Sequence, residues 1–399
     1  MKEKRKKGRV WKIIGLLLGA AALTLGVLMY VHVDFTNPRD LDRFVEAKMN
    51  KSGITGASIA LIEDNKLARI IHYGMADAEK DKPVTDETMF QIASVSKTVT
   101  ATAVMQLAEK GSIGLDDDIN EYLPFRVAHP KFTDTPITFR MLLTHTSSID
   151  NNWDVYDSLY TLHDGGGDSP LSLETFLSGF LVSGGKWYDE EKNFTNKQPG
   201  TTFAYSNIGY GLLGYLVEEI SGMPFPAYTQ QHIFDPLGMT STKWLHADLT
   251  DPTRLAIPYE AKNKPITPYS FPTYPDGALK TTAADFAKFY LAIMNGGRGE
   301  HGSILTASSI AEMFKPQADE GNQALGWSYD VLNSLYLDGV AKGTTLGHSG
   351  SDPGVTTITA FNPDTKSGFI AFFNQELDLN LRALNLHALM KRLVAETGM

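Results

Sequence analysis

The sequence of 399 residues contains no cysteine. Disulfide bonds, thiolate metal sites and a cysteine nucleophile are therefore excluded. The sequence also lacks an internal repeat, a low-complexity tract and any metal or cofactor signature, so we expect neither a cofactor nor a bound metal. The absence of cysteine does not by itself identify the cellular compartment.

Acidic residues are scarce in the first twelve residues and abundant in the rest of the chain. The first twelve residues carry seven lysines and arginines and one acidic residue, Glu3, for a net charge of +6. The whole chain has a formal net charge of −10, so subtracting +6 leaves −16 for the remainder. Because the part of the chain after residue 12 is this acidic, it repels phosphate backbones, and a nucleic-acid partner is not expected.

Charged residues are absent from Ile13 to Val31, a run rich in Leu, Ile, Val, Ala and Gly. A helix of this length roughly matches the ~30 Å hydrocarbon core of a bilayer. Basic residues precede the run and Asp34 follows it, which by the positive-inside tendency keeps the N-terminus in the cytoplasm. We therefore predict a cell-membrane protein with a cytoplasmic tail (1–12), a transmembrane signal-anchor helix (13–33) and an extracytoplasmic domain (34–399). A cleaved signal peptide is the alternative, although no A-x-A-like site lies near the end of the run.

Strand-like segments occur near both ends of the predicted domain. Alternation predicts strands over 57–62, 67–73, 344–348, 355–361 and 368–374. Helical spacing predicts helices over 40–50, 92–110, 208–220, 283–294 and 382–396. This order predicts an α+β fold in which an antiparallel sheet, built from N- and C-terminal segments and flanked by helices, is interrupted by a mostly helical subdomain. A cleft between the two parts is the natural place for a site.

One lysine lies in an otherwise apolar helical segment. Between Ser94 and Ala108, Lys97 is the only ionisable residue, and a helix that is apolar on nearly all sides is usually buried. Burial disfavours the ammonium form, which would make the amine a usable general base. Because residues three apart share a helix face, Lys97 can take the proton of Ser94. The alternative is that Ser94 only caps the helix while Lys97 extends to solvent.

Three short motifs together resemble one family. Ser94-Val95-Ser96-Lys97, Tyr205-Ser206-Asn207 and His348-Ser349-Gly350 occur in the order and approximate spacing of the serine β-lactamase and penicillin-binding-protein superfamily. The class C-like branch, which includes β-lactamases, D,D-peptidases, D-aminopeptidases and esterases, is the most similar. The segments that support this resemblance are 90–93 (FQIA), 137–148 (ITFRMLLTHTSS), 199–215 (PGTTFAYSNIGYGLLGY), 236–240 (PLGMT) and 347–354 (GHSGSDPG).

The resemblance implies a role for each motif residue. Ser94 would attack a carbonyl while Lys97 and Tyr205 handle its proton. Asn207 resembles the amide that orients the substrate and the lysine. His348, Ser349 and Gly350 would line the substrate site, and the backbone N–H groups of Ser94 and Ser351 would form the oxyanion hole. Taken singly, Tyr205-Ser206-Asn207 reads as an ordinary turn and His348 as a residue at a strand end.

The sequence also departs from the family pattern. Drug-hydrolysing relatives usually begin the third motif with lysine, whereas a histidine such as His348 is mostly neutral at neutral pH. A neutral imidazole anchors a substrate carboxylate less firmly, which favours an esterase or a peptidase over a dedicated β-lactamase. Ser148 stands where relatives commonly have glycine. His145 is interpreted as structural, and Gly347–Ser351 lacks the second glycine of a nucleophile elbow.

We therefore predict a serine hydrolase that forms an acyl-enzyme on Ser94 and hydrolyses an ester or amide. A cell-wall peptide, a D-amino-acid derivative or a small ester would be the substrate. The alternatives are a β-lactam-hydrolysing enzyme, a penicillin-binding sensor that is acylated without turnover, and a non-catalytic scaffold. The predicted partners are the substrate and the membrane, and the oligomeric state is left open.

Overall fold

The structure, a computed structural model, describes residues 33–260, 264–317, 322–329, 331–334, 341, 343–377 and 383–399, together with residues 14, 17, 18, 21, 22 and 24–30. Eight of the 21 residues of the predicted anchor at 13–33 lie outside the described ones. Within the described ranges, no helix combines the length and apolar character needed to cross a bilayer. The membrane anchor and the domain boundaries stay predictions.

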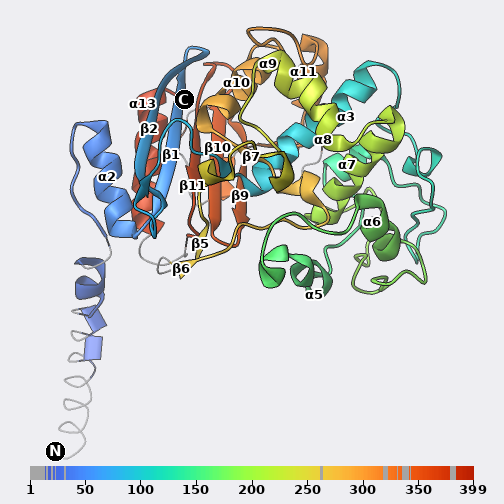
Figure 1. Ribbon diagram of the computed structural model, residues 1–399, viewed down its shortest axis with the longest axis horizontal. Coiled ribbons are helices and arrows are strands. Elements are labelled where there is room, and N and C mark those ends of the chain that lie inside the picture. The colour runs from blue at the N-terminus through green and yellow to red at the C-terminus, as the bar shows by residue number, and fades with distance from the viewer. Residues whose placement is uncertain are drawn as a thin grey trace, which may run out of the picture.

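A large antiparallel sheet joins the two ends of the domain (Figure 1). Its described strands run in the order β3-β2-β1-β11-β10-β9-β8. The N-terminal strand β1 pairs directly with the C-terminal strand β11, with Ile59 opposite Ala371. The strands are β1 Gly56–Glu63, β2 Lys66–Asp77, β3 Lys82–Pro83, β8 Ser328–Tyr329, β9 Leu346–Asp352, β10 Val355–Asn362 and β11 Ser367–Phe373. Two short sheets pair β4 Phe90–Gln91 with β7 Lys280–Thr281, and β5 Tyr259–Glu260 with β6 Lys264–Pro265.

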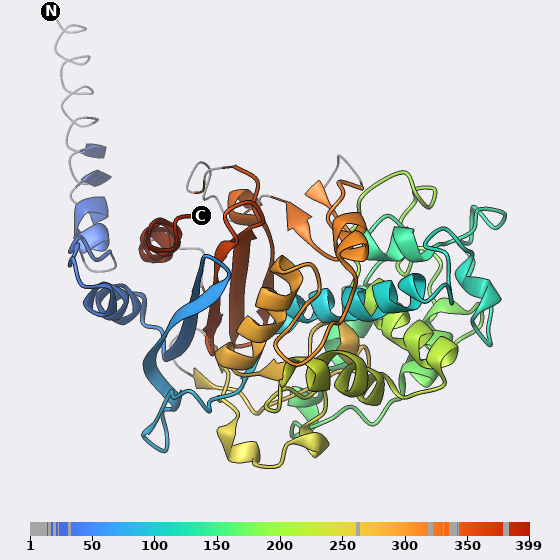
Figure 2. The same cartoon turned by 90° about the horizontal axis from the view of Figure 1, so that it is seen from above.

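Helices cover both faces of the large sheet. Figure 2 shows α2 and α13 on one face, and α10 with the helical region on the other. Successive residues of β1 point to opposite faces, so Ile59 and Leu61 pack toward α2 and α13, whereas Ala60 and Ile62 join the core of the helical region. The helices are α2 Leu41–Ser52, α3 Lys97–Glu109, α4 Phe139–Leu143, α5 Trp153–Tyr156, α6 Leu173–Leu181, α7 Asn207–Ser221, α8 Phe225–Thr229, α9 Asp235–Leu237, α10 Ala283–Met294, α11 Ala307–Met313, α12 Val331–Ser334 and α13 Ala383–Thr397.

The predicted α+β architecture is confirmed. Two predicted element boundaries, both beside the candidate active site described below, are wrong. The segment predicted as one helix over 92–110 is a short 3-10 helix, η1 Ala93–Ser96, followed by α3. The strand predicted over 344–348 is β9, which continues to Asp352. Glycine and aspartate have low strand propensity, so pairing of β9 with β10 rather than local preference extends this strand.

Ser148 has a backbone conformation that suits glycine. Its φ is +65°, and its buried hydroxyl has no hydrogen-bond partner among the described residues. We expect Ser148→Gly to stabilise the fold by about 1 kcal/mol, because relief of left-handed strain and of an unpaired hydroxyl outweighs the added chain entropy. Denaturant unfolding measures this difference.

The matched control is Ser147→Gly. Ser147 is equally buried, but its hydroxyl accepts a hydrogen bond from the Ile149 amide at 3.3 Å, so this variant should be less stable than the natural protein. A Ser148→Gly protein that unfolds at the same or lower denaturant concentration would contradict the interpretation.

Candidate active site

Ser94 lies in η1, immediately before α3 and beside the large sheet. The preceding residue, Ala93, has a φ of +47°, which is strained for any residue with a side chain. Such strain persists only where the surrounding structure imposes it, and it is frequent at active sites. Ser94 is partly exposed while Ala93, Val95 and Ser96 are buried, so the strained turn presents one hydroxyl to solvent.

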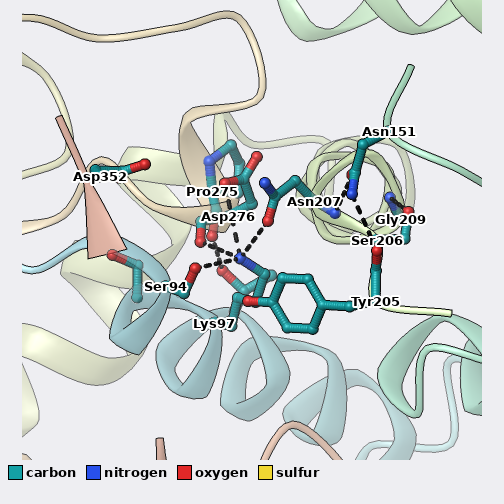
Figure 3. A network of polar contacts seen from close by, with 12 residues as sticks. Ser94, Lys97, Asn151, Tyr205, Ser206, Asn207, Gly209, Pro275, Asp276 and Asp352 are labelled. Carbon is teal, nitrogen blue, oxygen red and sulfur yellow. Dashed lines mark hydrogen bonds and ion pairs between the residues drawn. The ribbon is translucent and has the colours of Figure 1, made fainter. Parts of the chain in front are cut away.

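Lys97 is fully buried one turn after Ser94, at the start of a helix whose residues are buried as far as Leu107. Its Nζ lies 3.1 Å from Ser94 Oγ, 2.8 Å from Asn207 Oδ1 and 2.8 Å from the carbonyl oxygen of Asp276. Figure 3 shows the amine at the centre of these groups. The prediction of a buried lysine within reach of the serine is confirmed.

Burial is not the only influence on the charge of this amine. The Asp276 carboxylate lies 3.7 Å from Lys97 Nζ, and neither side chain is more than 2% exposed. The carboxylate and the two carbonyl oxygens favour an ammonium group at this nitrogen, whereas the Ser94 hydroxyl can either accept or donate. Periodicity of the helix predicted the burial of Lys97 but could not reveal an anion 179 residues away.

The second motif forms the start of α7. Ser206 is the N-cap residue, and its hydroxyl accepts a hydrogen bond from the Gly209 amide at 2.9 Å. This cap places Asn207 on the first turn, facing Lys97, and leaves Tyr205 just before the helix. Lys97 Nζ lies 5.0 Å from the centroid of the Tyr205 ring, and Tyr205 is 37% exposed. The structure therefore places Tyr205 beside the amine at the solvent-facing side of the site.

Asn151 holds this segment in place, and the sequence analysis missed it. Its Nδ2 donates to the Tyr205 carbonyl at 3.0 Å, and its Oδ1 accepts from the Asn207 amide at 2.7 Å. His145, which was interpreted as structural, is buried, and its Nδ1 accepts from the Ser206 amide at 3.1 Å. Its ring centroid lies 4.3 Å from that of Tyr205, so His145 supports the tyrosine.

The third motif lies on β9. A side chain on Gly350 would place its Cβ 2.9 Å from the Ser94 amide nitrogen and 2.8 Å from the Ile92 carbonyl oxygen. Only glycine fits at this separation, and the strand therefore packs directly against the nucleophile turn. His348 shares the face of Gly350 and is buried, whereas Ser349 and Ser351 alternate with them and are more exposed.

The imidazole of His348 is uncharged at neutral pH. Burial, followed by the positive charge of Lys97, lowers the pKa of His348 to about 4. Its Nδ1 lies 2.6 Å from the Ser349 carbonyl oxygen; a proton on Nδ1 would then donate to that oxygen. Burial and the neighbouring Lys97 and His348 also lower the pKa of His145 well below its usual range.

Two aspartates belong to the site, although the sequence analysis did not select them. Asp276 ends the short helix η8 Tyr274–Asp276, and its carboxylate oxygens each accept from the Tyr156 hydroxyl at 3.1 Å. Asp352 ends β9 and accepts from the Tyr160 hydroxyl at 2.9 Å. Burial raises the pKa of Asp276 to about 6, and burial followed by repulsion from Asp276 raises the pKa of Asp352 to about 7.

Comparisons with known proteins agree with this geometry. A protein-family model described as Beta-lactamase matches residues 41–391. The chain is 25% identical over 377 residues to a beta-lactamase of Pseudomonas fluorescens, which covers 88% of this chain and 97% of that protein. Two further relatives come from Bacillus subtilis (strain 168). The aligned region covers 74% of the putative penicillin-binding protein PbpX and 65% of penicillin-binding protein 4*.

Solved structures share the fold. The penicillin-binding protein from Bacillus halodurans superposes with a TM-score of 0.67 at 24% identity, covering 90% of this chain and 100% of that one. The class C beta lactamase from Rhodobacter sphaeroides gives a TM-score of 0.68 at 22% identity, covering 89% and 99%. At these identities the likeness establishes the fold, and the chemistry rests on the residues described above.

Proposed function

This chain belongs to the beta-lactamase family, and we propose that it hydrolyses an ester or amide through an acyl-enzyme on Ser94. Ser94 Oγ forms a bond to the substrate carbonyl carbon, and its proton passes to the Lys97–Tyr205 pair. The alcohol or amine leaves with that proton. Water then cleaves the acyl-enzyme, releasing the acid and restoring Ser94. The observation that carries this proposal is the 3.1 Å separation between Ser94 Oγ and the fully buried Lys97 amine.

The charges around the site support a substrate without a carboxylate. His348 is neutral, since its pKa is lowered to about 4, and it stands where drug-hydrolysing relatives usually have a lysine. Asp352, whose pKa is raised to about 7, adds partial negative charge nearby at neutral pH, which repels a second carboxylate. A small ester, or an amide whose acyl part is neutral or cationic, is therefore the proposed substrate class, and a β-lactam is a poor one.

The test is intact mass spectrometry combined with product release by the full-length protein. The probes are 4-nitrophenyl butyrate, D-alanine 4-nitroanilide, benzylpenicillin and a peptide ending in D-Ala-D-Ala. Many product molecules per enzyme from either of the first two probes would support the proposal. A lasting adduct with one equivalent of product would instead support the sensor, and neither product nor adduct with any probe would overturn acyl-enzyme chemistry.

Histidine at position 348 is expected to limit reactivity toward carboxylate-bearing drugs. We expect His348→Lys to raise the acylation rate by benzylpenicillin about tenfold, because a cation can form a charge-assisted hydrogen bond with the drug carboxylate. The neutral control His348→Gln should leave that rate unchanged. Stopped-flow kinetics measures the acylation rate of both variants. An unchanged rate for His348→Lys would contradict the proposed effect of the histidine.

The proposal includes an extracytoplasmic location at the membrane. Its support is the uncharged run from Ile13 to Val31 after a basic tail. Fractionation of cells and protease treatment of spheroplasts test it: the protein should pellet with membranes and be digested from outside. A protein recovered in the soluble cytoplasmic fraction would contradict the location without affecting the proposed chemistry.

A further inference from the structure

We infer that Asp276 is a positioning residue for this reaction, whose carboxylate keeps Lys97 in its ammonium form at neutral pH and shifts proton acceptance toward alkaline pH. The inference rests on the proposed function, because it concerns the proton that leaves Ser94. It goes beyond that function by assigning a role to a residue outside the three motifs.

The contacts of Lys97 favour a charged amine. Its Nζ has three oxygen acceptors within 3.1 Å, from Ser94, Asn207 and the backbone of Asp276. The Asp276 carboxylate follows at 3.7 Å. The aromatic rings of Tyr205 and Tyr210 lie 5.0 and 5.6 Å from the nitrogen, and their electron-rich faces attract a cation. Apart from the Ser94 hydroxyl, which can also donate, these groups stabilise the ammonium over the neutral amine.

The carboxylate of Asp276 is held rigidly against that amine. The Tyr156 hydroxyl on α5 contacts both of its oxygens, and the Thr100 hydroxyl on α3 donates to the adjoining Pro275 carbonyl at 2.7 Å. The carboxylate therefore cannot rotate away without breaking its contacts to Tyr156, and the bond from Thr100 holds the adjoining backbone. The Tyr156 hydroxyl donates a hydrogen bond to the carboxylate, which stabilises its ionised form.

The other titratable groups facing this pair do not replace the carboxylate. His145 and His348 face Lys97, and burial lowers the pKa of each, so both are neutral at neutral pH. Asp352 on β9 faces Asp276, and its pKa is raised to about 7. Tyr160 contacts Asp352 rather than the amine. Among the described residues, Asp276 is the anion that forms an ion pair with Lys97.

The carboxylate opposes proton acceptance by either candidate base. If Lys97 accepts the Ser94 proton, it must first lose its own, and a neighbouring anion makes that loss harder. If Tyr205 accepts it, the phenolate needs the attraction of the ammonium, and the carboxylate partly cancels that attraction. Removal of the negative charge should therefore release the base at lower pH in both cases.

The test is the pH profile of kcat/KM for full-length Asp276→Asn. Asparagine preserves the shape and the acceptor for Tyr156 but removes the charge. We expect the acid limb to move down by at least about one pH unit. The matched control is Asp285→Asn. Asp285 is also buried but contacts Ser241 and Lys288 instead of Lys97. The acid limb of the kcat/KM profile should therefore not move in this variant.

The outcomes separate the two proposals. An active natural enzyme with an unmoved acid limb in Asp276→Asn overturns the role of Asp276 and leaves the proposed function standing. A natural protein that turns over none of the probes overturns the proposed function itself. A loss of stability without a change in the limb would mark Asp276 as structural and would also overturn the inference.

A second measurement needs no substitution at Asp276. The 13Cε chemical shift of Lys97 reports its charge in protein labelled at lysine and is assigned by its absence from Lys97→Met. The inference requires the ammonium shift at pH 7. A neutral amine at pH 7 would overturn it even if Asp276→Asn cannot be purified.

Discussion

Ser94→Ala is expected to lower turnover by at least about 10⁴-fold while the protein stays folded. The variant removes the atom that forms the acyl bond, so no mass adduct should form with any probe. Ser94 is partly exposed and lies in a strained turn, and its truncation should therefore change the free energy of unfolding by less than about 1 kcal/mol. Intact mass spectrometry and denaturant unfolding measure the two effects.

Ser96→Ala provides the opposite pattern two residues away. Ser96 is fully buried, and its hydroxyl accepts from the Leu279 amide at 3.2 Å. Its loss leaves a buried donor unpaired, which should cost about 1–2 kcal/mol of stability but leave turnover within a few-fold. If Ser94→Ala still forms an adduct, or if both serine variants lose turnover equally, Ser94 is not the nucleophile.

Lys97→Met is expected to reduce acylation by at least about 10³-fold, because methionine fills the space but can neither accept nor donate the proton. It also leaves the Asp276 carboxylate buried without a cation. A buried ion pair broken on one side typically costs about 3 kcal/mol. Activity and stability should therefore both fall, for two separate physical reasons.

The double variant Lys97→Met with Asp276→Asn separates these reasons. Stability should recover, since no unpaired charge is left, while activity should not. A double variant no more stable than Lys97→Met would show that the ion pair is not the cause. Activity within tenfold of the natural enzyme in either variant would exclude Lys97 from catalysis.

The stability loss of Lys97→Met should depend on pH with a defined sign. The pKa of Asp276 is already raised by burial to about 6, and loss of the lysine raises it further. An acid with a raised pKa in the folded state loses stability as pH rises through that pKa. The gap between Lys97→Met and the natural protein should therefore be larger at pH 8 than at pH 5, as denaturant unfolding at both values would show.

Much of the fold could be predicted from the sequence. The helix predicted over 283–294 coincides with α10, and the strand predicted over 355–361 differs from β10 by one residue. These segments have strong periodicity and clear ends. At the Ser94 turn, prediction was poorer because Ala93 adopts a positive φ that no local preference favours, and β9 continues through glycine and serine because β10 pairs with it.

Burial of a lysine does not by itself identify a catalytic residue in this protein. Lys280 is also fully buried, and its Nζ donates to the Trp244 carbonyl at 2.7 Å. What distinguishes Lys97 is a serine hydroxyl one turn away, which the spacing did predict. Asp276 was missed because Pro275-Asp276-Gly277 reads as an ordinary turn, and Asp352 because it follows the third motif in a glycine-rich segment.

By itself, the sequence determined the order of strands and helices, the pairing of Ser94 with Lys97 on one turn, and the three motifs that mark the family. These properties depend on residues that are close in the chain or on patterns that repeat along it. Only the tertiary structure decided which charged groups meet at the site, because their closeness depends on distance in space rather than along the chain. Asp276 reaches the amine of Lys97 from a separate element 179 residues along the chain, and no local pattern records that meeting.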